Sequence, residues 1–244
     1  MRRTVLITGG SRGIGAACVR EFAQAGWSVR FFCRSAVDKA QKLCDELRSQ
    51  GHDVSFLLCD VSDRTQVRDA VRAILRTDHH LDALINNAGV AHIGLFTDMT
   101  EQQWDDLFNV NVKGVFHCTQ AVLEDMISEK RGCIVNVSSM WGEVGASCEV
   151  AYSAAKAALI GMTKALAKEV GPSGIRVNCV TPGVIATDMN AELTEDDLAS
   201  LSDETPLMRI GQPEEVAKTI LFLCGEDSSF ITGQVVGVSG GLVI

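Results

Sequence analysis

Short runs of apolar residues alternate along the chain with longer segments that have a helical pattern. Most of the runs are nearly continuous in apolar residues, which is typical of strands that are covered on both faces. The pattern predicts seven strands, at residues 4–8, 29–33, 54–59, 83–86, 133–138, 175–181 and 235–238.

The segments between these strands favour helices that stop at a glycine. AACVREFAQAG ends at Gly26 and KAQKLCDELRSQG ends at Gly51, and glycine is favoured directly after the last turn of a helix. Repeated strand–helix–strand units imply a parallel sheet with helices on both faces. We therefore expect an α/β fold, with a single doubly wound domain over residues 1–244.

Residues 183–212 form the least regular stretch, which lacks a strand pattern and contains the acidic run TEDD. In a doubly wound fold, an insertion after a late strand lies over the carboxyl edge of the sheet, where ligands bind. Long excursions in compact domains are usually functional. We interpret this stretch as a substrate lid, with a solvated surface helix as the alternative.

Composition and charge narrow the class of function. The 244 residues carry a net charge of -9, which disfavours nucleic-acid binding because such proteins usually have a basic face. No apolar run is long enough to span a membrane or to form a signal peptide, so we expect a cytoplasmic protein without membrane contact. The nine cysteines occur singly, which predicts reduced, mostly buried thiols and no metal site.

A glycine-rich turn, TGGSRGIG at residues 8–15, joins the first strand to the first helix. Its glycines let the backbone approach a pyrophosphate, and the start of the helix offers free N–H groups. The spacing is not GxGxxG, but its place between a strand and a helix is that of a dinucleotide site; a tight turn without a ligand is the alternative. Cofactor contacts are expected from Gly9, Ser11, Arg12, Gly13, Ile14 and Gly15.

The second predicted strand ends without the carboxylate that usually holds the ribose hydroxyls in an NAD enzyme. Arg34 and Ser35 follow it instead, and Arg12 lies in the glycine turn. Because a guanidinium pairs well with a 2′-phosphate, we expect NADPH/NADP+ rather than NADH as the cofactor. A solvated surface charge is the alternative interpretation of Arg34.

Two further strand ends fit a cofactor. Asp60 and Val61 follow the third strand and are placed to border the adenine, although Asp60 also suits the cap of a helix. NNAG follows the fourth strand, and its small residues and amides suit close passage of the cofactor; alone it would be an ordinary turn. We expect contacts here from Asn87, Ala88 and Gly89.

Three residues favour proton transfer at a carbonyl group. Ser139 ends the fifth strand, and Tyr152 and Lys156 are four residues apart on a helix, which places both side chains on one face. A nearby ammonium favours the phenolate and lowers the phenol pKa from about 10. Tyr152 would donate a proton to the carbonyl oxygen while Ser139 hydrogen-bonds the same atom. Taken singly, each of the three also suits an ordinary cap, packing or surface position.

Together these motifs resemble the short-chain dehydrogenase/reductase family over essentially the whole chain. The resemblance rests on TGGSRGIG, DV at residues 60–61, NNAG, NVNVKG, Ser139, YSAAK and PGVIATDM. It implies a Rossmann-type domain that reduces a ketone to a secondary alcohol with NADPH.

The resemblance also implies roles that the residues alone do not give. Asn111 would be catalytic and hold a water in a proton relay to Lys156, which would also hydrogen-bond the nicotinamide ribose. Thr187 would contact the nicotinamide carboxamide. A homotetramer is implied, with interfaces from the helices that hold Asn111 and Tyr152 and from the last strand. The cofactor contacts added in this way are Tyr152, Lys156, Pro182, Gly183, Val184, Ile185 and Thr187.

The carboxyl-terminal part is similar to bacterial 3-oxoacyl-[acyl-carrier-protein] reductases, which predicts a carrier-bound ketone and a place in fatty-acid biosynthesis. Lys130 and Arg131 offer a basic patch for an acidic carrier protein near the site. The other basic position that the resemblance predicts falls at the neutral Ser173.

The segment MWGEVGASCEVA, between Ser139 and Tyr152, favours a different ketone. It is expected to form the pocket wall with Trp141, Glu143 and Glu149, and a tryptophan face with carboxylates suits a cation. The segment resembles reductases proposed to act on the 5-aminopentanone modification of elongation factor P, a substrate with a ketone and an ammonium. The alternative is that both glutamates point to water.

Two other classes stay open. One is a dehydrogenase that oxidises a hydroxysteroid or a polyol, which the expected NADPH preference disfavours. The other is a non-catalytic NADPH-binding module, which the complete set of catalytic residues disfavours.

Overall fold

Seven parallel strands form one sheet in the order β3-β2-β1-β4-β5-β6-β7. The computed structural model describes residues 2–188 and 194–243. The predicted seven-stranded parallel sheet is confirmed, and no predicted strand end differs from the observed one by more than one residue. The strands are β1 (Thr4–Thr8), β2 (Ser28–Cys33), β3 (Val54–Leu58), β4 (Ala83–Asn86), β5 (Gly132–Val137), β6 (Ile175–Pro182) and β7 (Val235–Val238).

The chain reverses its direction of winding between β1 and β4. Strand β1 pairs in parallel with β2 on one side and with β4 on the other. A doubly wound sheet leaves a crevice for ligands where the carboxyl ends of two such strands diverge. The glycine turn follows β1 at this point, and the NNAG turn follows β4.

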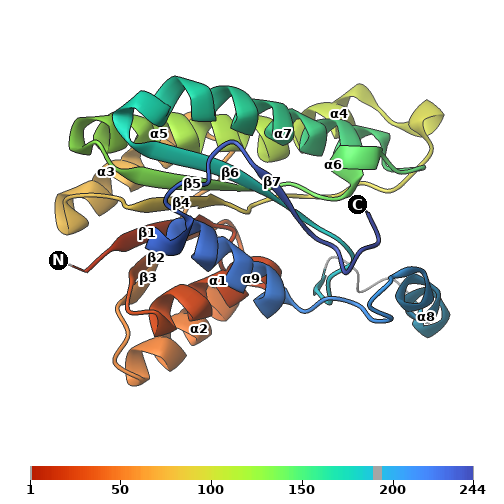
Figure 1. Cartoon of the computed structure of the whole chain (residues 1–244), viewed down its shortest axis with the longest axis horizontal. Coiled ribbons are helices and arrows are strands. Elements are labelled where there is room, and N and C mark those ends of the chain that lie inside the picture. The colour runs from red at the N-terminus through yellow and green to blue at the C-terminus, as the bar shows by residue number, and fades with distance from the viewer. Residues whose placement is uncertain (1, 189–193, 244) are drawn as a thin grey trace.

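Helices cover both faces of the sheet, as predicted. In Figure 1, α3, α5 and α7 lie on one face and α1, α2 and α9 on the other. The helices are α1 (Gly13–Gln24), α2 (Val37–Ser49), α3 (Arg64–Asp78), α4 (Glu101–Phe108), α5 (Gly114–Glu129), α6 (Trp141–Val144), α7 (Val150–Val170), α8 (Glu195–Glu204) and α9 (Pro213–Cys224). A π-helical turn, Asn109–Lys113, joins α4 to α5.

Apolar layers on both faces explain why the strands are nearly continuous in apolar residues. Phe22 of α1 and Phe31 of β2 are fully buried in one layer. Leu84 of β4 and Met126 of α5 are fully buried in the other. Each such side chain stabilises the fold by about 1.5–3 kcal/mol through removal from water, so the sheet is a rigid base for its carboxyl edge.

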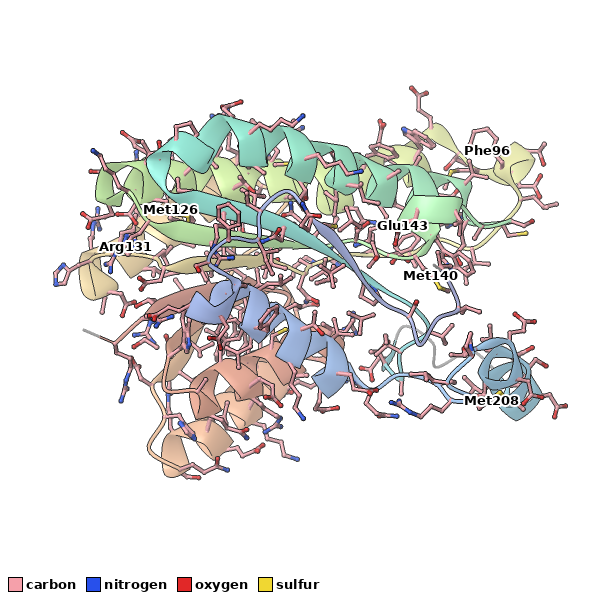
Figure 2. The ribbon with its side chains drawn as sticks, in the orientation of Figure 1. Phe96, Met126, Arg131, Met140, Glu143 and Met208 are labelled. Atoms are coloured by element: carbon pink, nitrogen blue, oxygen red, sulfur yellow. The ribbon has the colours of Figure 1, made fainter. Side chains whose placement is uncertain are left out.

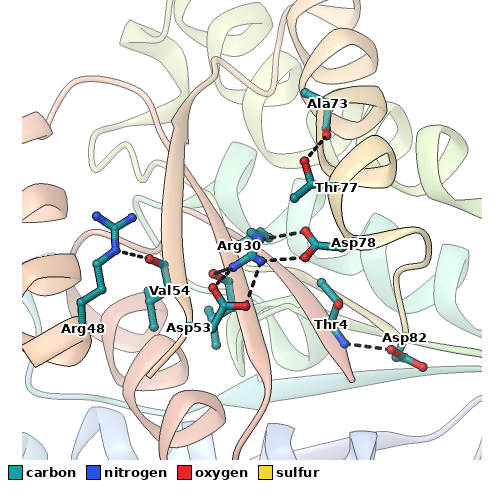
Figure 3. A network of polar contacts seen from close by, with 10 residues as sticks. Thr4, Arg30, Arg48, Asp53, Val54, Ala73, Thr77, Asp78 and Asp82 are labelled. Carbon is teal, nitrogen blue, oxygen red and sulfur yellow. Dashed lines mark hydrogen bonds and ion pairs between the residues drawn. The ribbon is translucent and has the colours of Figure 1, made fainter. Parts of the chain in front are cut away.

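An ion triad around the buried Arg30 holds the amino-terminal side of the sheet together (Figure 3). Arg30 of β2 donates to Asp53, which precedes β3, at 2.9 and 3.0 Å, and to Asp78 at the end of α3 at 2.8 and 2.6 Å. The two carboxylates raise the pKa of the Arg30 guanidinium against the opposing effect of burial. The positive charge is therefore fixed in place by two partners from distant parts of the chain.

The nine cysteines are all reduced, and eight of them are buried. Their distribution matches the expected mostly buried thiols. Among the described residues, no group of three or more possible ligands could hold a metal ion.

The region predicted to be a lid contains helix α8, which stands away from the main body of the molecule (Figure 1). Thr194 caps this helix through a reciprocal pair of hydrogen bonds with Asp197. The stem of the region is fixed, because Ile185 forms a parallel bridge to Gly211. Residues 189–193 lie outside the described part of the chain. Among the helices that the structure does describe, none has the length and apolar character needed to cross a membrane.

Candidate active site

The glycine turn brings the backbone of β1 against α1. Gly9 has a φ of 67°, in the left-handed region that favours glycine. At Gly15, a Cβ atom would collide with the carbonyl oxygen of Gly9. Helix α1 then starts at Gly13 after Arg12, whose side chain makes no capping hydrogen bond. Because these positions carry no side chains, there is room for a pyrophosphate to approach the backbone at the start of α1.

Thr8 fixes this turn to the end of β4, a role that the sequence analysis did not assign. Its hydroxyl oxygen accepts hydrogen bonds from the backbone N–H groups of Asn87 at 3.0 Å and Ala88 at 2.9 Å. The side-chain amide of Asn87 in turn donates to the carbonyl oxygens of Thr8 and Gly9 at 3.0 and 3.2 Å. In the sequence, the signal for this role was the threonine that begins TGGSRGIG.

The residues expected to hold a 2′-phosphate lie at the surface beside this turn. The Arg12, Arg34 and Ser35 side chains are exposed. The Arg34 guanidinium is 4.0 Å from a carboxylate oxygen of Asp60. Because both ion-pair partners are partly solvated, this contact is weak and leaves Arg34 able to bind another anion.

Asp60 and Val61 follow β3 at the carboxyl edge of the sheet, and Asp60 does not cap a helix. Its carboxylate accepts hydrogen bonds from the backbone N–H and the hydroxyl of Ser62, at 2.9 and 2.7 Å. Helix α3 is capped by Asp63, which accepts from two N–H groups of the first turn. The cap interpretation of Asp60 was therefore wrong, because the cap of α3 lies three residues later, at Asp63. Val61 is buried, and its carbonyl oxygen contacts the His117 ring at 3.0 Å.

Asn111 is fully buried in the π-helical turn between α4 and α5. Its side-chain amide donates to the carbonyl oxygen of Val90 and accepts from the Val90 N–H, both at 2.8 Å. A Cβ atom on Gly89 would lie 3.3 Å from the Asn111 side-chain oxygen and 3.5 Å from the Lys156 ammonium. The turn after β4 therefore brings Asn111 and Lys156 close to the same side of one glycine.

The three predicted proton-transfer residues meet at the carboxyl edge of the sheet. Ser139 follows β5, and Tyr152 and Lys156 lie on α7; all three side chains are buried. The Tyr152 hydroxyl hydrogen-bonds with Ser139. The Lys156 ammonium lies 5.6 Å from the centre of the Tyr152 ring and donates to the carbonyl oxygen of Val137 at 2.8 Å.

The pKa of Tyr152 shifts in the direction opposite to the one expected. Burial and, to a smaller extent, the charge of Glu149 raise it, the hydrogen bond with Ser139 lowers it, and the net result is a pKa of about 12. Burial also lowers the pKa of Lys156 to about 8. The sequence-based expectation considered the neighbouring ammonium and missed desolvation, which disfavours the charged form of both groups. The phenol is thus held protonated at neutral pH.

Residues outside the predicted set position α7 on the sheet. The Ser138 hydroxyl donates to the carbonyl oxygen of Lys156 at 2.7 Å. Deeper in the core, Asn86 of β4 donates to Asn136 of β5 at 2.9 Å, and Asn136 donates to Thr163 of α7 at 2.8 Å. Polar residues inside the apolar strands, in ALIN and CIVNVS, were the signal for this ladder of hydrogen bonds.

The predicted substrate wall is divided between two places. Glu149 directly precedes α7, makes no capping hydrogen bond with its side chain and is half-buried, and burial raises its pKa. It acts electrostatically on Tyr152. Glu143 is exposed and lines a pocket of about 490 Å³ under the carboxyl-terminal segment, together with Val184, Leu207 and Arg209, and Glu149 is not among the residues that line it. Trp141 packs beside Tyr152 in a small apolar cluster.

The basic patch at Lys130 and Arg131 lies at the wrong end of the sheet for this site. Both residues directly precede β5, whereas Ser139 follows its carboxyl end. A strand of this length spans about 20 Å. Figure 2 shows Arg131 at one end of the molecule and Met140 and Glu143 at the other. The expected patch near the active site of the same chain was therefore wrong, because a loop before a parallel strand emerges at the opposite edge.

The segment that follows β6 closes the site against the glycine turn. The carbonyl oxygen of Pro182 accepts from Met140 N–H at 3.0 Å. Thr187 lies against the turn, since a Cβ atom on Gly13 would be 3.4 Å from its methyl group. Val184 and Ile185 line the pocket under the carboxyl-terminal segment.

These features fit a nicotinamide dinucleotide. At one end, the lack of side chains at the glycines allows close approach to the backbone. The uncapped start of α1 and the exposed arginines add positive charge there. Buried Tyr152 and Lys156 offer a dry proton donor at the other. The site residues thus lie along one path over the carboxyl edge of the sheet.

Comparison with known proteins agrees with this geometry. The sequence model of the family described as short chain dehydrogenase matches residues 3–198. The chain is 42% identical over 246 residues to the 3-oxoacyl-[acyl-carrier-protein] reductase FabG of Thermotoga maritima, covering 99% of this chain and 98% of that protein. It is 40% identical over 243 residues to the FabG of Chlamydia trachomatis, with the same coverage. The crystal structure of gox2181 superposes with a TM-score of 0.94 at 35% identity, over 99% of this chain and 95% of that one.

Proposed function

Because this chain belongs to the short-chain dehydrogenase family, we propose that it reduces a ketone to a secondary alcohol with NADPH. The family relationship implies a nicotinamide cofactor and a reaction that interconverts a CH–OH group and a C=O group. The observation that supports the reductive direction is the buried phenol of Tyr152, whose pKa is raised to about 12, so that it keeps its proton at neutral pH. A proton donor for a developing alkoxide must hold its proton until the carbonyl oxygen becomes negative.

The side chains divide the remaining work between them. The bound nicotinamide would supply the hydride to the carbonyl carbon. Tyr152 would donate its phenol proton to the carbonyl oxygen, and the Ser139 hydroxyl would hydrogen-bond that oxygen. Lys156, buried and directed toward the end of β5, would stabilise the phenolate that remains and hold the ribose. Asn111 would keep a water beside Lys156, through which the proton is replaced.

The preference for NADPH rests on charge at the end of β2. Arg34 and Ser35 follow this strand where an NAD enzyme usually has a carboxylate, and Arg12 projects from the neighbouring turn. We expect tighter binding of NADPH than of NADH. Equal dissociation constants for the two would contradict this preference.

For the substrate, our first proposal is a 3-oxoacyl thioester carried by acyl carrier protein. It is supported by the names of relatives that match nearly the whole chain. The position of Lys130 and Arg131 does not favour docking of a carrier beside the site of the same chain. The expected homotetramer would have to bring such a surface from another subunit.

A second substrate is supported by Glu149. Its carboxylate is half-buried near Tyr152, and no hydrogen bond or ion pair to a cationic side chain in the described part of the chain neutralises it. A buried carboxylate near the reacting oxygen would bind a ketone that carries an ammonium group. We therefore propose the 5-aminopentanone modification of elongation factor P as the alternative substrate.

A side-by-side assay tests the two proposals. Consumption of NADPH is followed with an acetoacetyl thioester and with a small ketone bearing a terminal amine. Turnover of the thioester alone supports the carrier-bound substrate, and turnover of the amino ketone alone supports the modification enzyme. Glu149→Gln should then reduce kcat/KM for the amino ketone by about tenfold. Glu143→Gln is the matched control, because that carboxylate is exposed and lines a pocket that Glu149 does not line.

We also propose that the α8 region covers the bound substrate and that the enzyme works in the cytoplasm as a homotetramer. Phe116 and Ile127 of α5 support the assembly, since both are large apolar side chains that are exposed in the single chain. Sedimentation at several protein concentrations tests it, and a monomer throughout would contradict it.

A further inference from the structure

Lys39 lies beside the expected 2′-phosphate site and is paired with an anion of the chain itself. It lies in the first turn of α2, whose start has no side-chain cap. Its ammonium is 2.9 Å from a carboxylate oxygen of Asp188. The two residues are 149 positions apart in the sequence, so only the fold brings them together.

Asp188 reaches Lys39 from the segment that closes over the glycine turn. The preceding residue, Thr187, lies against Gly13. The pKa of Asp188 is lowered first by Lys39 and also by the charge of Arg12. One carboxylate therefore pairs with a cation of α2 and also feels the charge of Arg12 in the glycine turn, a residue expected to hold the 2′-phosphate.

We propose that Lys39 selects for the 2′-phosphate of NADPH. Before the cofactor binds, the Asp188 carboxylate pairs with Lys39 as an internal anion, and the phosphate then displaces this carboxylate. This inference depends on the NADPH preference proposed above. A phosphate monoester has a charge of about −1.5 to −2 at neutral pH and three acceptor oxygens, whereas a carboxylate has a single charge. The phosphate is therefore the stronger partner for the ammonium and for the start of α2. NADH, which lacks this group, leaves the pair between Lys39 and Asp188 intact.

Both partners are exposed, with 59% and 55% of their side-chain surfaces accessible. An exposed pair of this kind is weak, so a ligand can break it readily. Replacement of either residue should also leave the fold intact. Binding of the cofactor can therefore be measured in the full-length protein.

The test is a double-mutant cycle on the dissociation constants of NADPH and NADH. Lys39→Gln should weaken NADPH binding by about tenfold and leave NADH binding within about twofold. Asp188→Asn should tighten NADPH binding by about threefold, because the competing anion is gone. In the Lys39→Gln background, Asp188→Asn should lose this effect. Lys42→Gln removes the same charge from the exposed side of α2 and is the matched control.

The outcomes separate this inference from the proposal that supports it. If the unmodified protein binds both cofactors equally, the NADPH preference fails and the inference fails with it. If it prefers NADPH but Lys39→Gln leaves the ratio of the two constants unchanged, only the role of Lys39 is overturned. If Asp188→Asn tightens NADPH binding equally with and without Lys39, Asp188 repels the phosphate at a distance, and the internal-anion role is overturned.

Discussion

Two buried cations, Arg30 and Lys156, lie at opposite ends of the same sheet. Arg30 has two carboxylate partners, and its pKa is raised despite burial. Lys156 has only the carbonyl oxygen of Val137 as a described hydrogen-bond partner, and burial lowers its pKa to about 8. A paired buried charge stays fixed, whereas an unpaired one is poised to gain or lose a proton. The amino end of the sheet thus holds a fixed charge, and the carboxyl end holds one that can lose its proton near pH 8.

The largest expected effect is the loss of turnover at the carboxyl end. Tyr152→Phe removes the phenol that would donate the proton and should reduce kcat by about 10³-fold. Binding of NADPH, measured by titration, should change by less than about twofold, since the glycine turn is untouched. Turnover close to that of the unmodified enzyme would exclude Tyr152 as the donor.

At the amino end, Asp78→Asn should lower stability and spare the chemistry. It leaves the buried Arg30 with an incomplete set of partners, and breaking such a pair costs about 3–5 kcal/mol. Urea denaturation gives the change, and activity per folded molecule should be unaltered. Asp69→Asn is the control, because its pair with Arg68 is exposed on both sides and should contribute less than about 1 kcal/mol.

Lys156→Met should show the opposite combination, with activity lost and stability gained. The Lys156 pKa falls from 10.5 to about 8 on folding, which corresponds to about 3 kcal/mol of destabilisation below pH 8. After subtraction of about 1 kcal/mol for the hydrogen bond to Val137, the variant should be more stable by about 2 kcal/mol near pH 7.

The pH dependence sharpens this prediction. Between about pH 8 and 10 the unfolded lysine keeps its proton and the folded one does not, so the stability of the unmodified protein should rise with pH. The difference from Lys156→Met should therefore shrink in urea denaturation near pH 9.5. A difference that stays constant would show that the ammonium is not desolvated in the folded protein.

The smallest effect is expected for Arg131→Gln. This arginine is 55% exposed and lies 3.5 Å from Asp82, so its loss should change stability by less than about 1 kcal/mol. Reduction of a small free ketone should also be unchanged, because Arg131 is at the far edge of the sheet from Ser139. A clear loss of such activity would contradict the separation of the two ends.

Local patterns predicted the elements that hold the site. The continuous apolar runs gave every strand to within one residue, and the spacing of Tyr152 and Lys156 placed them on one face of α7. Misassignments arose where the answer depended on distant parts of the chain. Asp60 was a possible cap until the position of α3 was known, and Lys130 and Arg131 were placed near the site until the direction of β5 was known.

The sequence by itself determined the parallel sheet, the glycine turn and the placement of Tyr152 and Lys156 on one face of a helix, because periodicity and short spacings act within one element. Only the tertiary structure decided that Asp188 pairs with Lys39 and in which direction the pKa values of Tyr152 and Lys156 move. Burial and charge depend on atoms that residues far apart in the chain bring together, so desolvation of Tyr152 and Lys156 appears only when the helices close over the sheet.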